Sequence, residues 1–151
     1  MLTVRARVYG LDSTETWLQG LSSRAANLQP IWPTIETIFW KWEREQFEGE
    51  GALSGGWPPL SQKYAEWKAR HYPGRRILEL RGYLKESMTG RGRYTVLDEA
   101  PQHLVIGTSV PYARKHQTGR GRVPARPFLV VPRREVQEFS VALAQYLVLG
   151  R

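Results

Sequence analysis

Most apolar residues of this chain recur at the spacing of an α-helix, in segments that proline and glycine separate. The clearest stripe follows Pro33 and places isoleucine, phenylalanine and tryptophan side chains on one helical face. Such a face needs a partner surface to cover it, so the chain is expected to pack several helices around a common core. Proline near a helix start and glycine after a helix end mark the boundaries. The pattern predicts helices over residues 13–28, 33–48, 61–71, 77–89 and 133–148.

Short β-type runs lie between these helical segments. Apolar and polar residues alternate over 2–9, and residues rich in β-branched side chains occupy 93–99, 103–108 and 128–131. We therefore expect an α+β fold in which a small, mostly antiparallel sheet of about four strands packs against several helices. A chain of 151 residues fits a single domain over 1–151. The stretches 49–60 and 114–127, rich in glycine, proline or arginine, are predicted to be long, flexible, exposed loops.

Composition excludes several classes of protein. The chain has no cysteine, which excludes a disulfide scaffold, a thiolate metal site and a cysteine nucleophile. Residues 1–20 lack the apolar core of a signal peptide, and no apolar run is long enough to span a bilayer. We therefore expect a soluble protein made inside the cell, with no membrane partner.

Positive charge is concentrated in the later part of the chain. Residues 1–50 carry five basic and seven acidic side chains, whereas the rest carry seventeen basic and seven acidic ones. A block of this kind favours a polyanion or an acidic protein surface, although a solvated surface in an arginine-rich protein is the competing interpretation. The predicted basic loop, expected to face a partner or DNA, contains Arg114, Lys115, Arg120, Arg122 and Arg126.

A pentapeptide, TGRGR, occurs twice, at 89–93 and at 118–122. Five residues are too few for a repeat fold, and neither copy has the spacing of a Walker loop or a dinucleotide fingerprint. We interpret the two copies as flexible basic loops.

No group of residues has the spacing of a catalytic site. The acidic residues between 43 and 48 and the Asp98–Glu99 pair are interpreted as solvated charges, and the three histidines lie far apart in the chain. His116, next to Gln117, is interpreted as a hydrogen-bonded structural residue. We expect no enzyme, no metal site and no cofactor. The open alternative is a nuclease whose metal-dependent activity Asp98→Asn or Glu99→Gln abolishes.

Three further segments carry a more specific pattern. The first is GWPPLS at 56–61, followed by Lys68, and the second is ILELRGYLKES at 77–87. The third is IGTSVPYA at 106–113, followed by His116, Gln117 and Gly119, and then by VPARPFL at 123–129. These segments resemble the phage virion morphogenesis family, the tail-completion and head-to-tail joining proteins of tailed phages, and the third segment matches in both order and spacing.

The resemblance implies a structural virion protein that forms a ring, most often a hexamer, at the neck or head-proximal tail end, with no cofactor. Its partners are then copies of itself and neighbouring neck, connector or tail-tube proteins, in a virion assembled in the host cytoplasm. Each copy carries a formal charge of +8, so a ring needs compensation from acidic surfaces or from genomic DNA in its lumen. Tail terminator and head-side adaptor both stay open, and a non-specific nucleic-acid-binding module is the alternative from another class.

The motif residues in the two predicted loops are candidates for subunit interfaces. Trp57 and Phe128 border flexible segments, as interface hot spots often do, although they could equally pin the loops onto their own core. Tyr112 is the only aromatic residue between 110 and 126, which is thin support for base stacking. The full set of candidates is Trp57, Pro59, Leu60, Tyr112, His116, Gln117, Pro124, Pro127 and Phe128.

Overall fold

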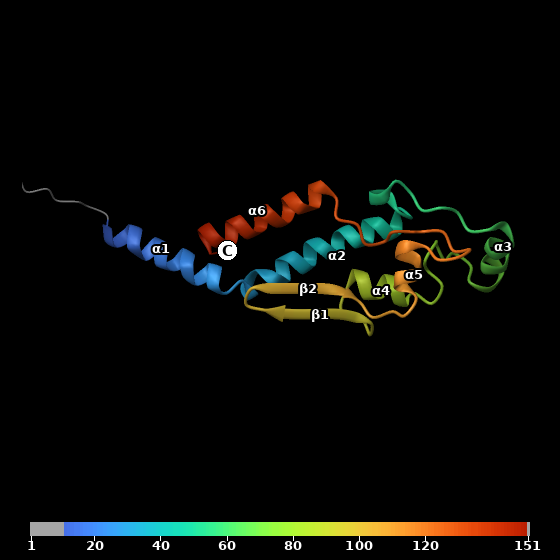
Figure 1. The fold of residues 1–151 in the computed structure, drawn as a ribbon, viewed down its shortest axis with the longest axis horizontal. Coiled ribbons are helices and arrows are strands. Elements are labelled where there is room, and N and C mark those ends of the chain that lie inside the picture. Colours follow the sequence, from blue (N-terminus) through green and yellow to red (C-terminus); the bar gives the residue numbers. More distant parts are fainter. Residues whose placement is uncertain (1–10, 151) are drawn as a thin grey trace, which may run out of the picture.

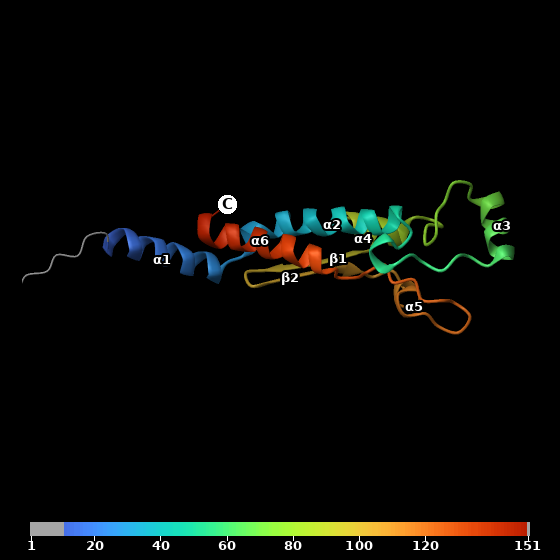
Figure 2. The same cartoon turned by 90° about the horizontal axis from the view of Figure 1, so that it is seen from above.

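The computed structural model describes residues 11–150, and the strand predicted at 2–9 lies outside them. Within the described residues, six α-helices, two short 3-10 helices and one β-hairpin form an elongated molecule (Figures 1 and 2). The α+β class is confirmed. No described helix is both long and apolar enough to cross a membrane.

Helix α2 (Trp32–Glu48) is the centre of the fold. It follows a 3-10 helix (Gln29–Ile31), carries Pro33 in its first turn and ends at Gly49. Its buried face contains Phe39, Trp42 and Phe47, as the apolar spacing predicts. Helix α1 (Leu11–Ala26) precedes it and projects beyond the rest of the molecule at one end (Figures 1 and 2).

The expected sheet of about four strands is wrong: the described residues contain one two-stranded antiparallel sheet. Strand β1 (Thr95–Ala100) pairs with β2 (His103–Thr108) in a register that joins Thr95 to Thr108. Residues 128–131 form no strand. The reason is that the Gln117 side chain accepts hydrogen bonds from the N–H groups of Phe128 and Leu129, at 3.1 and 3.0 Å, and so takes the place of a neighbouring strand.

The helix predicted over 77–89 is shorter, because α4 covers only Tyr83–Thr89. Leu78 has a φ of 62°, a left-handed conformation that interrupts a helix, and the Ile77 N–H donates instead to the Glu50 carboxylate at 2.7 Å. Helix α3 (Gln62–His71) lies between two irregular stretches and stands away from the body at the end opposite α1 (Figures 1 and 2).

The remaining helices cover α2. Helix α6 (Arg133–Leu149) packs along α2 and contacts α1, and the short helix α5 (Ala113–Thr118) follows β2. A second 3-10 helix spans Ala52–Ser54. The main core gathers α2, α4, β2, α5, the first predicted loop and Phe128, which directly follows the second predicted loop. A smaller core joins α2 to α6. Buried apolar members of the main core are Phe39, Trp42, Phe47, Trp57, Leu84, Met88, Val110, Ala113 and Phe128.

The two TGRGR copies differ in their surroundings. In the first, Arg91 forms ion pairs with the buried Glu36 and with Glu99, both at 2.9 Å, so this copy is not a free basic loop. In the second, Arg120 pairs with Val123 through an isolated β-bridge, which makes a tight turn. The identical sequences therefore serve different purposes, one in tying a loop to a helix and one in forming an exposed turn.

Candidate functional site

The two predicted loops meet at the carbonyl oxygen of Pro127. This oxygen accepts hydrogen bonds from the indole N–H of Trp57 and from the amide of Gln46, both at 2.8 Å. The Gln46 amide also donates to the Ser54 hydroxyl at 2.9 Å, and its oxygen accepts the Leu53 N–H at 2.8 Å. One buried side chain of α2 thus fastens both loops to the helix.

Two further motif residues complete this arrangement. Gln117 holds the backbone at Phe128 and Leu129, and the buried Phe128 ring packs 6.2 Å from that of Phe47. Phe47 also meets Trp57 edge-on, with ring centroids 5.4 Å apart. We call Gln46, Trp57, Gln117, Arg126 and Pro127 the loop clasp.

Arg126 belongs to the clasp rather than to the exposed surface. It is 5% exposed, and its guanidinium donates to the carbonyl oxygens of Pro58 and Pro59, both at 2.8 Å. These bonds hold the chain that leads into α3. Burial lowers the pKa of Arg126, but the pKa of an arginine is so high that the group stays charged.

The other four predicted basic residues are exposed. Arg114 and Lys115 lie on α5, and Arg120 and Arg122 lie on the turn that follows it. His116 is half-buried between them and the clasp, and its pKa is lowered by burial and then by the charges of Arg126 and Lys115. It is therefore neutral near pH 7, and its exposed neighbours form the basic surface.

The remaining candidates divide between the surface and the interior. Pro59 and Pro124 are exposed, and Leu60 is half-buried. Tyr112 is 41% exposed, and its ring meets that of His116 edge-on at 5.8 Å.

The structure also brings aromatic residues to Tyr112 from distant parts of the chain. Tyr83 and Tyr94 lie with ring centroids 5.5 Å apart, and the Arg93 guanidinium lies 5.4 Å from the Tyr94 ring centroid. The pKa of Tyr112 is raised by burial and then by the nearby hydroxyls of Tyr83 and Tyr94. Three tyrosines therefore share one surface region. Two of them, Tyr83 and Tyr94, lie outside residues 110–126, where the sequence analysis looked for aromatic residues.

The interpretation of Glu43 as a solvated charge is wrong. Its side chain is fully buried, and neither carboxylate oxygen has a hydrogen-bond partner. Burial raises its pKa from about 4.5 to about 9, so the carboxyl group is protonated near pH 7. An acid without a base, a nucleophile or an opening to solvent does not form a catalytic centre.

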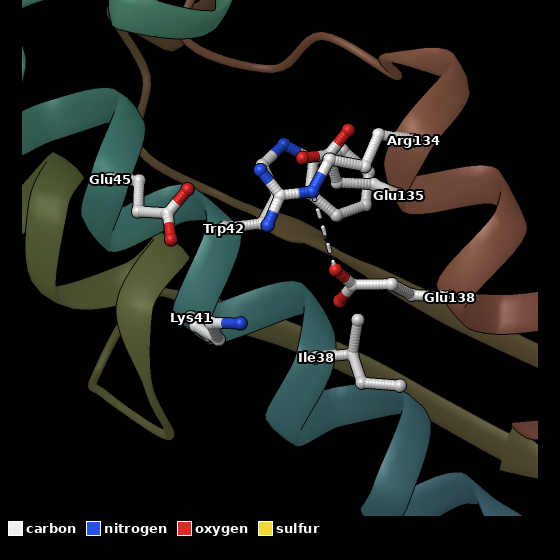
Figure 3. A pocket seen from close by; sticks show the side chains of 7 residues that line it. All are labelled: Ile38, Lys41, Trp42, Glu45, Arg134, Glu135 and Glu138. Carbon is white, nitrogen blue, oxygen red and sulfur yellow. Dashed lines mark ion pairs between the residues drawn. The ribbon is translucent and has the colours of Figure 1, made fainter.

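A small cavity between α2 and α6 contains polar groups but is too small for a substrate (Figure 3). Its volume is about 10 Å³, close to that of one water molecule. Arg134 and Glu138 form an ion pair at its rim, 3.6 Å apart, and the buried Glu135 faces inward with one oxygen unpartnered. Among the side chains that the structure describes, residues 13–150, no three His, Asp or Glu gather closely enough to hold a metal ion.

Sequence reasoning missed Gln46 as a key residue. Its position in the sequence could have indicated this role. Gln46 lies four residues after Trp42 and therefore on the buried side of the helix, where a glutamine needs hydrogen-bond partners.

These features describe an α+β protein whose loops are tied firmly to a helical core while basic and aromatic side chains stay exposed. The model of the phage virion morphogenesis family matches residues 10–148, and the chain belongs to that family. It is therefore a component of a phage virion or of its assembly. Searches of curated proteins and of solved structures gave no match.

Proposed function

We propose that this chain is a structural, non-catalytic subunit of a ring, with a hexamer as the expected form, at the neck or head-proximal tail end of a tailed phage. It acts there in tail completion, as a terminator of the tail or a joint between head and tail. The family membership supports a virion role, and the shape of the subunit supports a ring.

The observation that carries the proposal is the difference between the two ends of the molecule. At one end α1 exposes Trp17 and Leu18, which are 48% and 52% accessible. At the other end α3 exposes the stacked rings of Tyr64 and Trp67, with centroids 5.5 Å apart. When the exposed α1 end of one copy contacts a different surface of the next copy, the contact is head-to-tail, and such contacts form a ring when the rotation between subunits closes.

We assign α1 to the contact between sister copies and the opposite end to a neighbouring protein or DNA. The exposed Arg114, Lys115, Arg120 and Arg122 lie at the α3 end of the molecule, where they can meet phosphates or acidic side chains (Figure 1). Phosphate contacts of this kind are independent of base sequence and weaken with salt.

The test combines solution mass with particle assembly. Light scattering of the purified protein, followed by electron microscopy of particles labelled on this subunit, should show a closed ring at the head–tail joint. Trp17→Glu should disrupt ring formation, whereas the control Ser22→Glu, which adds the same charge to another exposed position of α1, should not. Complete, infectious particles that lack the protein would refute the proposal.

The basic surface has its own test. Replacing Arg114, Lys115, Arg120 and Arg122 together with glutamine should lower infectivity at least about tenfold while the subunit remains folded. A variant that assembles infectious particles normally would refute the role of this surface.

A non-specific nucleic-acid-binding module is the second candidate, and the tyrosine cluster favours it. Tyr83, Tyr94 and Tyr112, with Arg93 over one ring, offer stacking and cation–π contacts to unpaired bases. Fluorescence anisotropy with labelled single-stranded DNA should then detect binding that falls steeply with salt and weakens in Tyr83→Ala. Absence of binding at low salt excludes this candidate.

A further inference from the structure

A long apolar groove runs along one face of the molecule between β2 and α6. Its volume is about 550 Å³, a size typical of binding sites, and α2 forms its floor through Trp32, Phe39 and Trp42. Val131 and Phe139 line the side opposite β2. All but three of the lining side chains are apolar, so the groove suits an apolar occupant.

One wall of the groove is the edge of a strand. Within the described residues β2 pairs only with β1, and β2 lies between β1 and the helices α2 and α6, so its unpaired edge faces the groove (Figure 1). Leu104 and Ile106 of β2 both line it. An unpaired edge beside an apolar trough is the arrangement that accepts an added strand through main-chain hydrogen bonds.

The chain contains a segment with the matching pattern. Over residues 2–9, Leu2, Val4, Ala6 and Val8 alternate with polar residues, so that one face of an extended strand is apolar. Eight extended residues span about 26 Å, enough to follow the six residues of β2 from end to end. Placed in the groove, the apolar face of such a strand would contact the floor, and the arginines of the other face would reach solvent.

This segment cannot enter the groove of its own chain. The Ala26 end of α1 lies beside the hairpin, where the Leu28 N–H donates to the Pro101 carbonyl at 2.6 Å, and the Leu11 end points away from the body (Figures 1 and 2). The 16 residues of α1 are about 24 Å long. With residues 2–9 in the groove, only Gly10 remains to bridge that length, and one residue spans about 3.5 Å.

We propose that residues 2–9 of one copy add as a strand to the free edge of β2 in the next copy and fill its apolar groove. This inference rests on the proposed ring, and it specifies how neighbouring copies join. The projecting α1 then acts as the spacer that carries the segment across the gap between subunits.

The test uses the absence of cysteine in the native chain. One variant carries Val8→Cys, and a second, with a mass tag at its C-terminus, carries Val131→Cys at the groove. The two proteins are mixed, assembled and treated with a short bismaleimide. Because each chain has one thiol, a mixed covalent dimer reports contact between two copies. The matched control replaces Val131→Cys with Val96→Cys, an exposed position on β1 outside the groove.

The proposal expects the mixed dimer with Val131→Cys at a yield at least about tenfold above the Val96→Cys control. Adding Val4→Asp to the Val8→Cys chain should remove most of it, because a carboxylate then enters an apolar groove. Thr3→Asp, which adds the same charge to the opposite face, should leave the yield unchanged.

The outcomes separate this inference from the ring itself. A ring seen by light scattering and microscopy, without the mixed dimer, overturns the strand addition and leaves the ring standing. Cross-links only between two Val131→Cys chains show that grooves face each other, and also overturn it. A protein that stays monomeric in solution and is absent from the head–tail joint of particles overturns both.

Discussion

Replacing the buried Glu43 with methionine should remove a pH dependence from the stability of the protein. The carboxyl group is fully buried and unpartnered, with a pKa raised by burial to about 9. In the unfolded chain the same group titrates near 4.5. Between these two pKa values the folded state holds a proton that the unfolded state has lost. The contribution of this group to the free energy of unfolding is therefore fully present below about pH 4.5 and is lost as the pH rises toward 9.

The size of the effect follows from the two pKa values. Each pKa unit corresponds to about 1.4 kcal/mol, so moving from pH 5 to pH 8 should cost the wild type about 4 kcal/mol through this group. That is a large part of the stability of an ordinary domain. Glu43→Met keeps a similar volume and cannot ionise, so its advantage over the wild type should grow by about 4 kcal/mol over the same range.

Urea unfolding followed by tryptophan fluorescence at several pH values measures this difference. Comparing variant with wild type at each pH cancels the contribution of other titrating groups. Glu45→Met, at an exposed position of the same helix, is the control and should change the pH dependence by less than about 0.5 kcal/mol. Stability curves for wild type and Glu43→Met that run parallel from pH 5 to pH 8 would refute the reasoning.

Three further substitutions probe the clasp, each by urea unfolding. Gln46→Met should destabilise the protein by about 2–3 kcal/mol, because it leaves the partly buried Leu53 N–H without its acceptor and removes a donor from Pro127. A loss below about 0.5 kcal/mol contradicts the clasp. Arg126→Gln should cost about 2 kcal/mol through its two carbonyl contacts, whereas the exposed Arg120→Gln should cost almost nothing, and equal effects would argue against the distinction. Gly51→Ala should lower the free energy of unfolding by at least about 3 kcal/mol, since φ is 97° and the new methyl group would lie 2.6 Å from Trp57. Its control, Gly55→Ala, at φ 82° with open space around it, should lower it by about 1 kcal/mol. A larger loss for Gly55→Ala than for Gly51→Ala would contradict the close contact between Gly51 and Trp57.

The long helices were predictable because their pattern is local. The apolar spacing from Ile35 to Phe47 defines α2, and the stripe before the C-terminal glycine defines α6. The polar members of the buried face were not predictable in the same way. Positions 36, 43 and 46 have the spacing of that face, but carboxylates and amides are normally exposed, so the sequence analysis placed the acids of 43–48 in solvent.

The absent strands show a different limit. Residues 128–131 have the composition of a strand, but their backbone hydrogen bonds go to one distant side chain, Gln117, rather than to a sheet. The interruption at Leu78 likewise depends on Glu50, which lies 27 residues before Ile77 and accepts its N–H. The exposed basic residues could be chosen from charge alone, whereas the burial of Arg126 depends on two proline carbonyls that only the folded chain brings near.

The fastening of both loops at one proline carbonyl has an evolutionary consequence. The turn between Gly119 and Val123 is anchored at its base by these hydrogen bonds to Pro127, whereas its tip is exposed. Related proteins can therefore differ in the length and charge of this tip while the hydrophobic core stays unchanged. A change in the turn alone then does not require the rest of the protein to be redesigned.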